Sequence, residues 1–171
     1  MVEQSLTTGR SGPAALDTSF WNVAFQAGAL GYVLQFHELH APSAVEAEIN
    51  SAASPVQRPK AAMFNALRTS GVVRRTDPRQ ITVNLYGPGD RAVLSLGSER
   101  RWPVLINDTR PHAYARLQLQ LDAVSVPELL VLAVYAGWLP KNEALAMLRQ
   151  IGPITGAILM QAATLAITQY L

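Results

Sequence analysis

Four acidic residues occupy positions from which carboxylates could share a divalent cation. Asp17 follows a short apolar run and Asp108 ends another, while Asp90 opens an expected helix and Glu48 lies within one. The chain contains only 12 acidic residues in all. Four of them at the rims of expected secondary elements are therefore the first candidates for a functional site.

Such a set of carboxylates has a known chemical use. Mg²⁺ and Mn²⁺ prefer carboxylate and water oxygens, and carboxylates held together repel one another until a cation relieves the repulsion. A bound cation activates a water molecule and neutralises charge on a phosphodiester. The alternative is structural, because an Asp that precedes a helix often serves only as its N-cap. Asp17, Asp90 and Asp108 all fit that alternative when each is considered alone.

Glu48 is not explained as a cap. In an expected helix over residues 43–53 it lies on the same face as Val45 and Ala52, whereas Glu46 points about 200° away, toward solvent. A carboxylate on an apolar face is costly unless a partner compensates it. That partner could be a cation or an arginine.

The hydrophobic pattern predicts alternating strands and helices. We expect strands over residues 13–16, 36–40, 81–86, 104–106 and 123–126. We expect helices over residues 20–34, 43–53, 61–69, 90–98, 110–118, 127–137, 141–150 and 153–170. This order predicts an α/β fold, a three-layer α/β/α sandwich with a central parallel sheet. Ligands usually bind at the carboxyl edge of such a sheet, where Asp17 and Asp108 would fall.

Composition favours one domain. A chain of 171 residues with 49% hydrophobic residues can form one large core. We expect a flexible leader over residues 1–12 and a single domain over residues 13–171, with additional helices from about residue 140. The absence of cysteine excludes a thiolate zinc site and a cysteine nucleophile. It also fits a reducing compartment, and the cytoplasm is the default expectation.

The last 21 residues carry no charge, which is about the length needed to cross a bilayer. Gln161, Thr164 and Thr168 nevertheless form a polar stripe at helical spacing. The stripe favours a helix that packs on the body or on a partner over a membrane anchor.

The net charge is only +2, but arginines gather in two stretches that could attract phosphate. They are Arg74, Arg75 and Arg79 in one, and Arg91, Arg100, Arg101, Arg110 and Arg116 in the other. A solvated surface is the equally simple interpretation. The three histidines do not have zinc-ligand spacing, and no Gly-x-Ser-x-Gly or phosphate-binding loop is present.

Taken in order, these segments resemble the PIN-domain nucleases, particularly the small prokaryotic proteins related to VapC-type toxins. The resemblance rests on Leu16-Asp17-Thr18-Ser19, Pro42-Ser-Ala-Val-Glu-Ala-Glu48-Ile49, Gly89-Asp90-Arg91-Ala92-Val93 and Val104-Leu-Ile-Asn-Asp108-Thr-Arg110-Pro-His-Ala113. It covers residues 16–137. The chain departs from the family pattern in three places. Asp90 stands where the family more often has Glu, and residues 50–79 match no part of the pattern. The pattern also does not specify the role of the helices after Gly137.

The resemblance implies an acidic pocket of Asp17, Glu48, Asp90 and Asp108. Polar support would come from Thr18 or Ser19 and from Asn107. It implies Mg²⁺ or Mn²⁺ as the cofactor, with Asp17 and Asp108 as direct metal ligands. Asp90 and Glu48 would bind the metal through water or orient the attacking water, so Asp90 also belongs to the expected metal site.

It further implies hydrolysis of single-stranded RNA to leave a 5′-phosphate, with Arg91 and Arg110 on the nucleic-acid backbone. The residues alone do not separate RNA from DNA. The expected partners are an antitoxin protein and a second copy of the chain in a homodimer. The alternative function is a catalytically inactive PIN-like scaffold that binds protein or nucleic acid, in which the acids serve as caps. A third possibility is a peripheral membrane protein held by the last helix.

Overall fold

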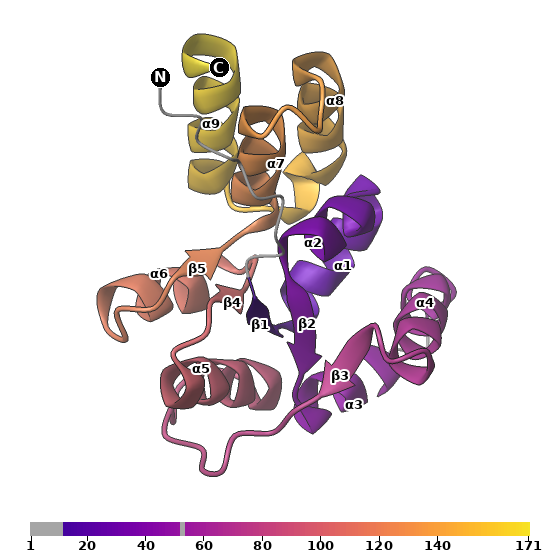
Figure 1. The fold of residues 1–171 in the computed structure, drawn as a ribbon, viewed down its shortest axis with the longest axis vertical. Helices are drawn as coiled ribbons and strands as arrows, with labels where there is room; N and C mark the ends of the chain where they lie inside the picture. Colours follow the sequence, from indigo (N-terminus) through magenta and orange to yellow (C-terminus); the bar gives the residue numbers. More distant parts are fainter. Residues whose placement is uncertain (1–11, 52–53) are drawn as a thin grey trace, which may run out of the picture.

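One parallel sheet of five strands organises the chain (Figure 1). The computed structural model describes residues 12–51 and 54–171. Its strands are β1 (Pro13–Leu16), β2 (Glu38–Ala41), β3 (Val73–Arg75), β4 (Val104–Leu105) and β5 (Ala123–Val124). They lie in the order β3-β2-β1-β4-β5, and every neighbouring pair is parallel. The predicted α/β class with a central parallel sheet is confirmed.

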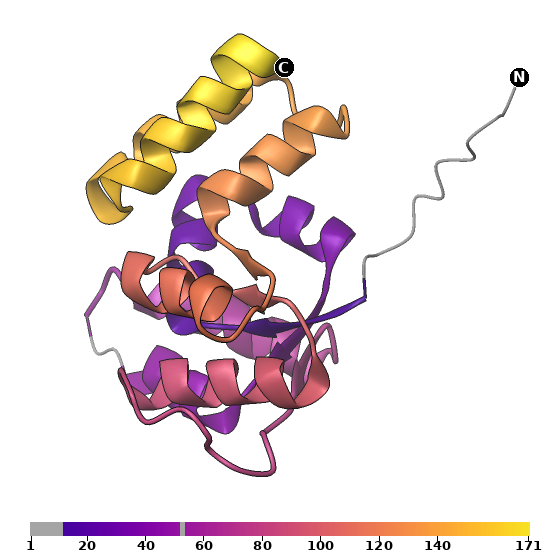
Figure 2. The same ribbon diagram turned by 90° about the vertical axis from the view of Figure 1, so that its left-hand side faces the viewer.

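Helices surround this sheet. They are α1 (Thr18–Ala27), α2 (Leu30–Phe36), α3 (Ser43–Ser51), α4 (Arg58–Thr69), α5 (Pro88–Arg100), α6 (Thr109–Leu117), α7 (Val126–Tyr135), α8 (Lys141–Ile151) and α9 (Ala157–Leu165). A short 3₁₀ turn, η1 (Gly152–Ile154), precedes α9, and the π-helical turn η2 (Ala166–Tyr170) extends it. Figure 2 shows α5 on one side of the sheet and the C-terminal helices α7, α8 and α9 on the other, which agrees with a three-layer sandwich.

The first strand in the sequence is the middle strand of the sheet. β1 pairs with β2 on one side and with β4 on the other. Its side chains Ala14 and Ala15 are fully buried, and these small residues leave room for the layers above and below it. Beyond the strand the ladder continues where Asp17 N–H donates to the Leu105 carbonyl at 3.0 Å. This bond sets the ends of β1 and β4 side by side.

The helix predicted over residues 20–34 is divided in two. α1 ends at Gly28, whose backbone is left-handed with φ 70°, and α2 begins at Leu30. α2 extends to Phe36, which was predicted to belong to the second strand. The strand therefore begins at Glu38, two residues later than predicted. Gly28 therefore ends a helix, as its freedom at positive φ allows.

The strand predicted over residues 81–86 is wrong. Only Val83 is buried in that segment, which runs along α5 without pairing with a strand. Its backbone uses a side chain instead: the N–H groups of Thr82 and Val83 donate to Ser95 Oγ at 3.0 and 3.3 Å. The missing edge strand is β3, three residues long, whose Arg74 and Arg75 are exposed.

The helix predicted over residues 153–170 is also interrupted: η1 is followed by the non-helical Thr155 and Gly156, and α9 begins only at Ala157. The remaining elements agree with the sequence apart from their ends. α4 starts at Arg58, before the predicted residue 61, because Pro59 sits in its first turn rather than in a loop. α7 begins with the expected cap: Ser125 and Glu128 form a capping box. The predicted leader lies outside the described residues except for Gly12. Over residues 12–51 and 54–171, no helix is long and apolar enough to cross a membrane.

Candidate functional site

The four candidate acids come from four separate elements around the carboxyl ends of β1 and β4. Asp17 follows β1 and caps α1, while Asp108 follows β4 and precedes α6. Asp90 lies in the first turn of α5, and Glu48 lies near the end of α3. Asp17 is 2% exposed, Glu48 and Asp90 are half-buried, and Asp108 is exposed. The site therefore runs from a buried end at Asp17 to an open end at Asp108.

Ser19 joins the two strand ends. Its hydroxyl donates to Asp17 Oδ2 at 2.6 Å and accepts the backbone N–H groups of Asn107 and Asp108 at 3.1 and 3.3 Å. Its own N–H also donates to Asp17 Oδ2, at 2.9 Å. Asp17 is thus a helix cap, as the structural alternative expected. The same contacts also hold it beside the end of β4.

Glu48 connects three helices. Its Oε2 accepts the Thr18 hydroxyl at 2.6 Å, and its Oε1 accepts the backbone N–H of Gly89 at 2.8 Å. The partners that compensate this inward-facing carboxylate are therefore a hydroxyl and an amide, not an arginine. Glu46 instead pairs with arginines, including Arg75 at 2.9 Å.

Gly89 is required for this arrangement. A Cβ atom built on it would come within 2.7 Å of Glu48 Cδ, which is closer than real contacts allow. Any side chain at this position would push the carboxylate away, so the glycine allows α5 to approach α3 through Glu48.

Asp90 and Asp108 differ in how their carboxylates are used. Asp90 accepts a hydrogen bond from the backbone N–H of Gly87, the residue that caps α5. Asp108 holds the N-cap position of α6, yet its side chain makes no capping bond there. Among the described residues, no hydrogen bond reaches the Asp108 carboxylate. The cap interpretation therefore fails for the Asp108 side chain.

Electrostatic repulsion couples the acids. Burial, followed by the nearby carboxylate of Asp90, raises the pKa of Asp17 to about 7 although bonds from Ser19 oppose the rise. Burial and then the carboxylate of Asp108 raise the pKa of Asp90 to about 6, against the bond from Gly87. Burial also raises the pKa of Asp108. Ionised carboxylates in this region destabilise one another, and a cation would relieve that cost.

The acidic side chains could bind a metal ion through one or two carboxylates but do not form a closed cage around it. In the part of the chain that the structure describes, no group of three or more acidic or histidine side chains is placed to hold a metal together. The expected trio of Asp17, Asp90 and Asp108 is therefore not assembled as one cage. Mg²⁺, however, usually binds through one or two carboxylates and keeps several waters. The hard oxygen donors and the free carboxylate of Asp108 fit that open mode.

Asn107 links the site to the C-terminal helices. Its Oδ1 accepts the N–H of Val126 at the start of α7 at 3.1 Å, and its Nδ2 donates to Thr155 Oγ1 before α9 at 3.2 Å. Gly156 allows this approach, because a Cβ there would collide with Thr109 Oγ1. The helices beyond the resemblance thus contact the residues on either side of Asp108.

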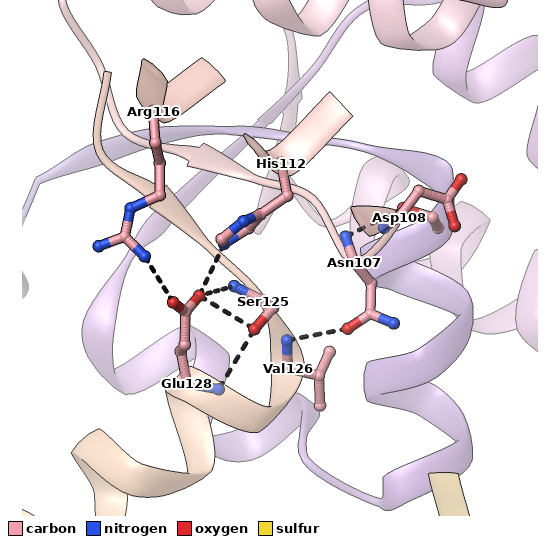
Figure 3. A network of polar contacts seen from close by, with 8 residues as sticks. Asn107, Asp108, His112, Arg116, Ser125, Val126 and Glu128 are labelled. Carbon is pink, nitrogen blue, oxygen red and sulfur yellow. Dashed lines mark hydrogen bonds and ion pairs between the residues drawn. The ribbon is translucent and has the colours of Figure 1, made fainter. Parts of the chain in front are cut away.

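A second polar network lies behind this strand end (Figure 3). Glu128 accepts bonds from His112 Nε2, Arg116 Nη1 and Ser125, each between 2.7 and 2.9 Å. Burial alone would raise the pKa of Glu128, but the bonds from His112 and Ser125 hold it at about 2. Figure 3 shows the Asp108 carboxylate pointing away from this network. The network fixes α6 to α7 and leaves Asp108 outside it.

The two predicted nucleic-acid-binding arginines are close in sequence to two of the acids. Arg91 follows Asp90, and its Nε donates to the Tyr86 carbonyl at 2.9 Å. Arg110, two residues after Asp108, is exposed. Of the two, Arg110 is the more open to a ligand.

Sequence reasoning missed Gly89, Thr155 and Gly156. Gly89 stands directly before Asp90 at a helix start, where a glycine can signal the close approach of another part of the chain. Thr155 and Gly156 carry no local signal. Their place beside Asn107 depends on how the C-terminal helices fold back.

The fold and the site together define an α/β protein with an acidic carboxyl edge on its parallel sheet. Comparison with family models, curated proteins and solved structures finds no match for the chain. The resemblance to PIN-domain nucleases therefore stays a prediction from the sequence.

Proposed function

We propose that this chain is a metal-dependent endoribonuclease of PIN-like type that hydrolyses phosphodiester bonds of single-stranded RNA. The observation that carries the proposal is the placement of Asp17 and Asp108 at the carboxyl ends of two adjacent strands, joined through the Ser19 hydroxyl, with Asp90 near enough to raise the pKa of Asp17. Asp17 and Asp108 are the proposed metal-binding pair, with Asp90 between them in electrostatic contact. A structural cap gains nothing from a neighbouring carboxylate, whereas a bound cation relieves the repulsion between two of them.

Each residue has a proposed task. Asp17 is held by Ser19 and supplies a fixed carboxylate, while the open carboxylate of Asp108 faces the substrate side. Mg²⁺ or Mn²⁺, when bound, would lower the pKa of a coordinated water and neutralise charge on the phosphate. Glu48 holds α3 against α1 and α5 and so keeps the pocket in shape. Arg110 would bind the RNA backbone.

The experiment is calorimetric titration of Mn²⁺ into the wild type and into the double variant Asp17→Asn, Asp108→Asn. Both samples are then incubated with Mn²⁺ and a single-stranded RNA labelled at either end, and with DNA of the same sequence. We expect the wild type to bind Mn²⁺ and cut RNA to fragments with a 5′-phosphate, and the double variant to do neither. Asp122→Asn, an exposed aspartate away from the four acids, is the matched control.

The outcomes separate the candidate functions. A wild type that takes up no Mn²⁺ and cuts no RNA would refute the nuclease. Cleavage of DNA but not RNA would keep the chemistry and change the substrate. If cleavage is found, arrest of bacterial growth by the wild type but not by the double variant would support a toxin, and with it a proposed antitoxin partner.

The second candidate is a scaffold that binds a protein, and one observation favours it. A groove of about 680 Å³ lies between β5, α7 and α9, with a largely apolar wall that includes Val131, Leu132 and Leu159. The same surface would serve the proposed homodimer. A scaffold predicts no uptake of Mn²⁺, and it predicts that Asp17→Asn with Asp108→Asn leaves the mass in solution unchanged.

A further inference from the structure

Tyr86 has an unusual backbone for its position. Its φ is 68°, in the left-handed region that glycine adopts at no cost and other residues only with strain. Arg101, which has a similar φ, is the residue at which α5 ends, where this conformation is common. Tyr86 instead stands immediately before the helix, next to the N-cap Gly87. Backbone strain in residues other than glycine concentrates at active sites and ligand-binding sites.

Three contacts hold the residue in place. Its carbonyl accepts Arg91 Nε at 2.9 Å, and its hydroxyl lies 3.5 Å from the Arg110 carbonyl. Its ring meets Tyr114 of α6 in a T-shaped pair, with the centroids 5.7 Å apart. Both rings are only half-buried. Tyr86 therefore bridges the start of α5 and the start of α6 and keeps part of its ring open to solvent.

These contacts bring the ring close to the acidic pocket. Tyr86 lies four residues before Asp90, and Arg110, which it contacts, lies two residues after Asp108. The carboxylate of Asp108 lies close enough to Asp90 to raise the pKa of Asp90. The aromatic pair thus connects the segment just before α5, whose first turn carries Asp90, to α6, which follows Asp108.

The combination has a chemical meaning for a single-stranded ligand. Proteins that hold such strands combine arginines along the backbone with aromatic rings on which bases stack. A tyrosine needed only for packing would not require a strained backbone beside a pocket. It would also gain nothing from leaving part of its ring open to solvent.

We infer that Tyr86, supported by Tyr114, forms a nucleobase-stacking subsite that orients one nucleotide next to the bond that is cut. The ligand class is an unpaired base of a single-stranded nucleic acid, recognised by its ring face. The inference rests on the proposed nuclease function, because it assigns a role within the same site. Tyr86 acts here as a positioning residue and takes no part in the chemical step.

The test measures binding without cleavage, by fluorescence anisotropy of a labelled single-stranded RNA in EDTA. Tyr86→Leu keeps an apolar side chain but removes the ring face, and we expect its affinity to fall about 5- to 150-fold, the usual range for losing one stacked base. Tyr86→Phe keeps the ring and should stay within about twofold of the wild type, since the base stacks on the ring and not on the hydroxyl. Tyr135→Leu, an exposed tyrosine on α7, is the matched control. Circular dichroism checks that each variant is folded.

A second measurement varies the RNA. A series of RNAs, each lacking one base at a successive position, is bound to the wild type. We expect removal of the base at one position to lower the affinity of the wild type for the RNA. The same removal should have no effect on the affinity of Tyr86→Leu. The subsite is overturned if no missing base matters or if Tyr86→Phe loses as much affinity as Tyr86→Leu.

The failure of this inference is distinguishable from failure of the proposed function. A wild type that binds and cuts RNA while Tyr86→Leu behaves identically would overturn only the subsite. A wild type that neither binds nor cuts RNA would overturn both.

Discussion

Ionisation of Asp17 destabilises the fold, and replacing this residue with asparagine should remove the cost. Asp17 is 2% exposed and has a pKa of about 7 in the folded chain, against 3.8 for a free side chain. The folded state therefore keeps a proton that the unfolded state has lost, so stability falls as the pH rises from about 3.8 to about 7. At about 1.36 kcal/mol per pKa unit, the loss between pH 4.5 and pH 8 is about 3 kcal/mol.

The assay is urea unfolding in EDTA, followed by the fluorescence of the buried Trp21, at pH 4.5 and at pH 8. The wild type should lose about 3 kcal/mol more unfolding free energy over this interval than Asp17→Asn, because Asp90 and Asp108, whose pKa values are also raised, contribute to the loss in both proteins. Asp122→Asn, an exposed aspartate, should follow the wild type. Equal losses in the wild type and in Asp17→Asn would refute the electrostatic reasoning for this site.

Two further predictions concern Gly89 and Glu128. Gly89→Ala places a methyl group against the carboxylate of Glu48 and should lower the free energy of unfolding by about 1 to 3 kcal/mol. We expect RNA cleavage to be lost as well. Unchanged stability in urea would contradict the close approach of α5 to Glu48. Glu128 has a pKa of about 2, so it stabilises the fold above about pH 4.5 and this contribution is lost as the pH falls toward 2. Glu128→Gln should therefore show a flatter loss of stability than the wild type in acid, measured by circular dichroism, and parallel curves would rule the idea out.

The parallel sheet could be predicted because most of its strands are apolar runs between amphipathic helices. β1 agreed residue for residue with the predicted strand, and α7 begins within one residue of its predicted start. β3 could not be predicted, since a three-residue strand with two exposed arginines has no apolar run. The pattern over residues 81–86 alternates like a strand, but the hydroxyl of Ser95 accepts the backbone N–H groups that a neighbouring strand would have taken.

The candidate acids could be picked out from the sequence because each stands at the end or start of an element. Their different surroundings could not be predicted. The hydroxyl of Thr18, 30 positions away in the sequence, binds Glu48, and nothing local indicates that pairing. The link from Asn107 to Thr155 spans 48 positions and depends on the return of the C-terminal helices to the strand end.

The place of β1 in the middle of the sheet has a consequence for the order of synthesis. Asp17 is translated well before β4 and Asp108, and β5, which flanks β4, is translated later still. A chain interrupted before β4 has Asp17 without its neighbour across the site. We therefore expect the acidic site to form only after the chain has been extended past β4 and Asp108, whichever elements fold first.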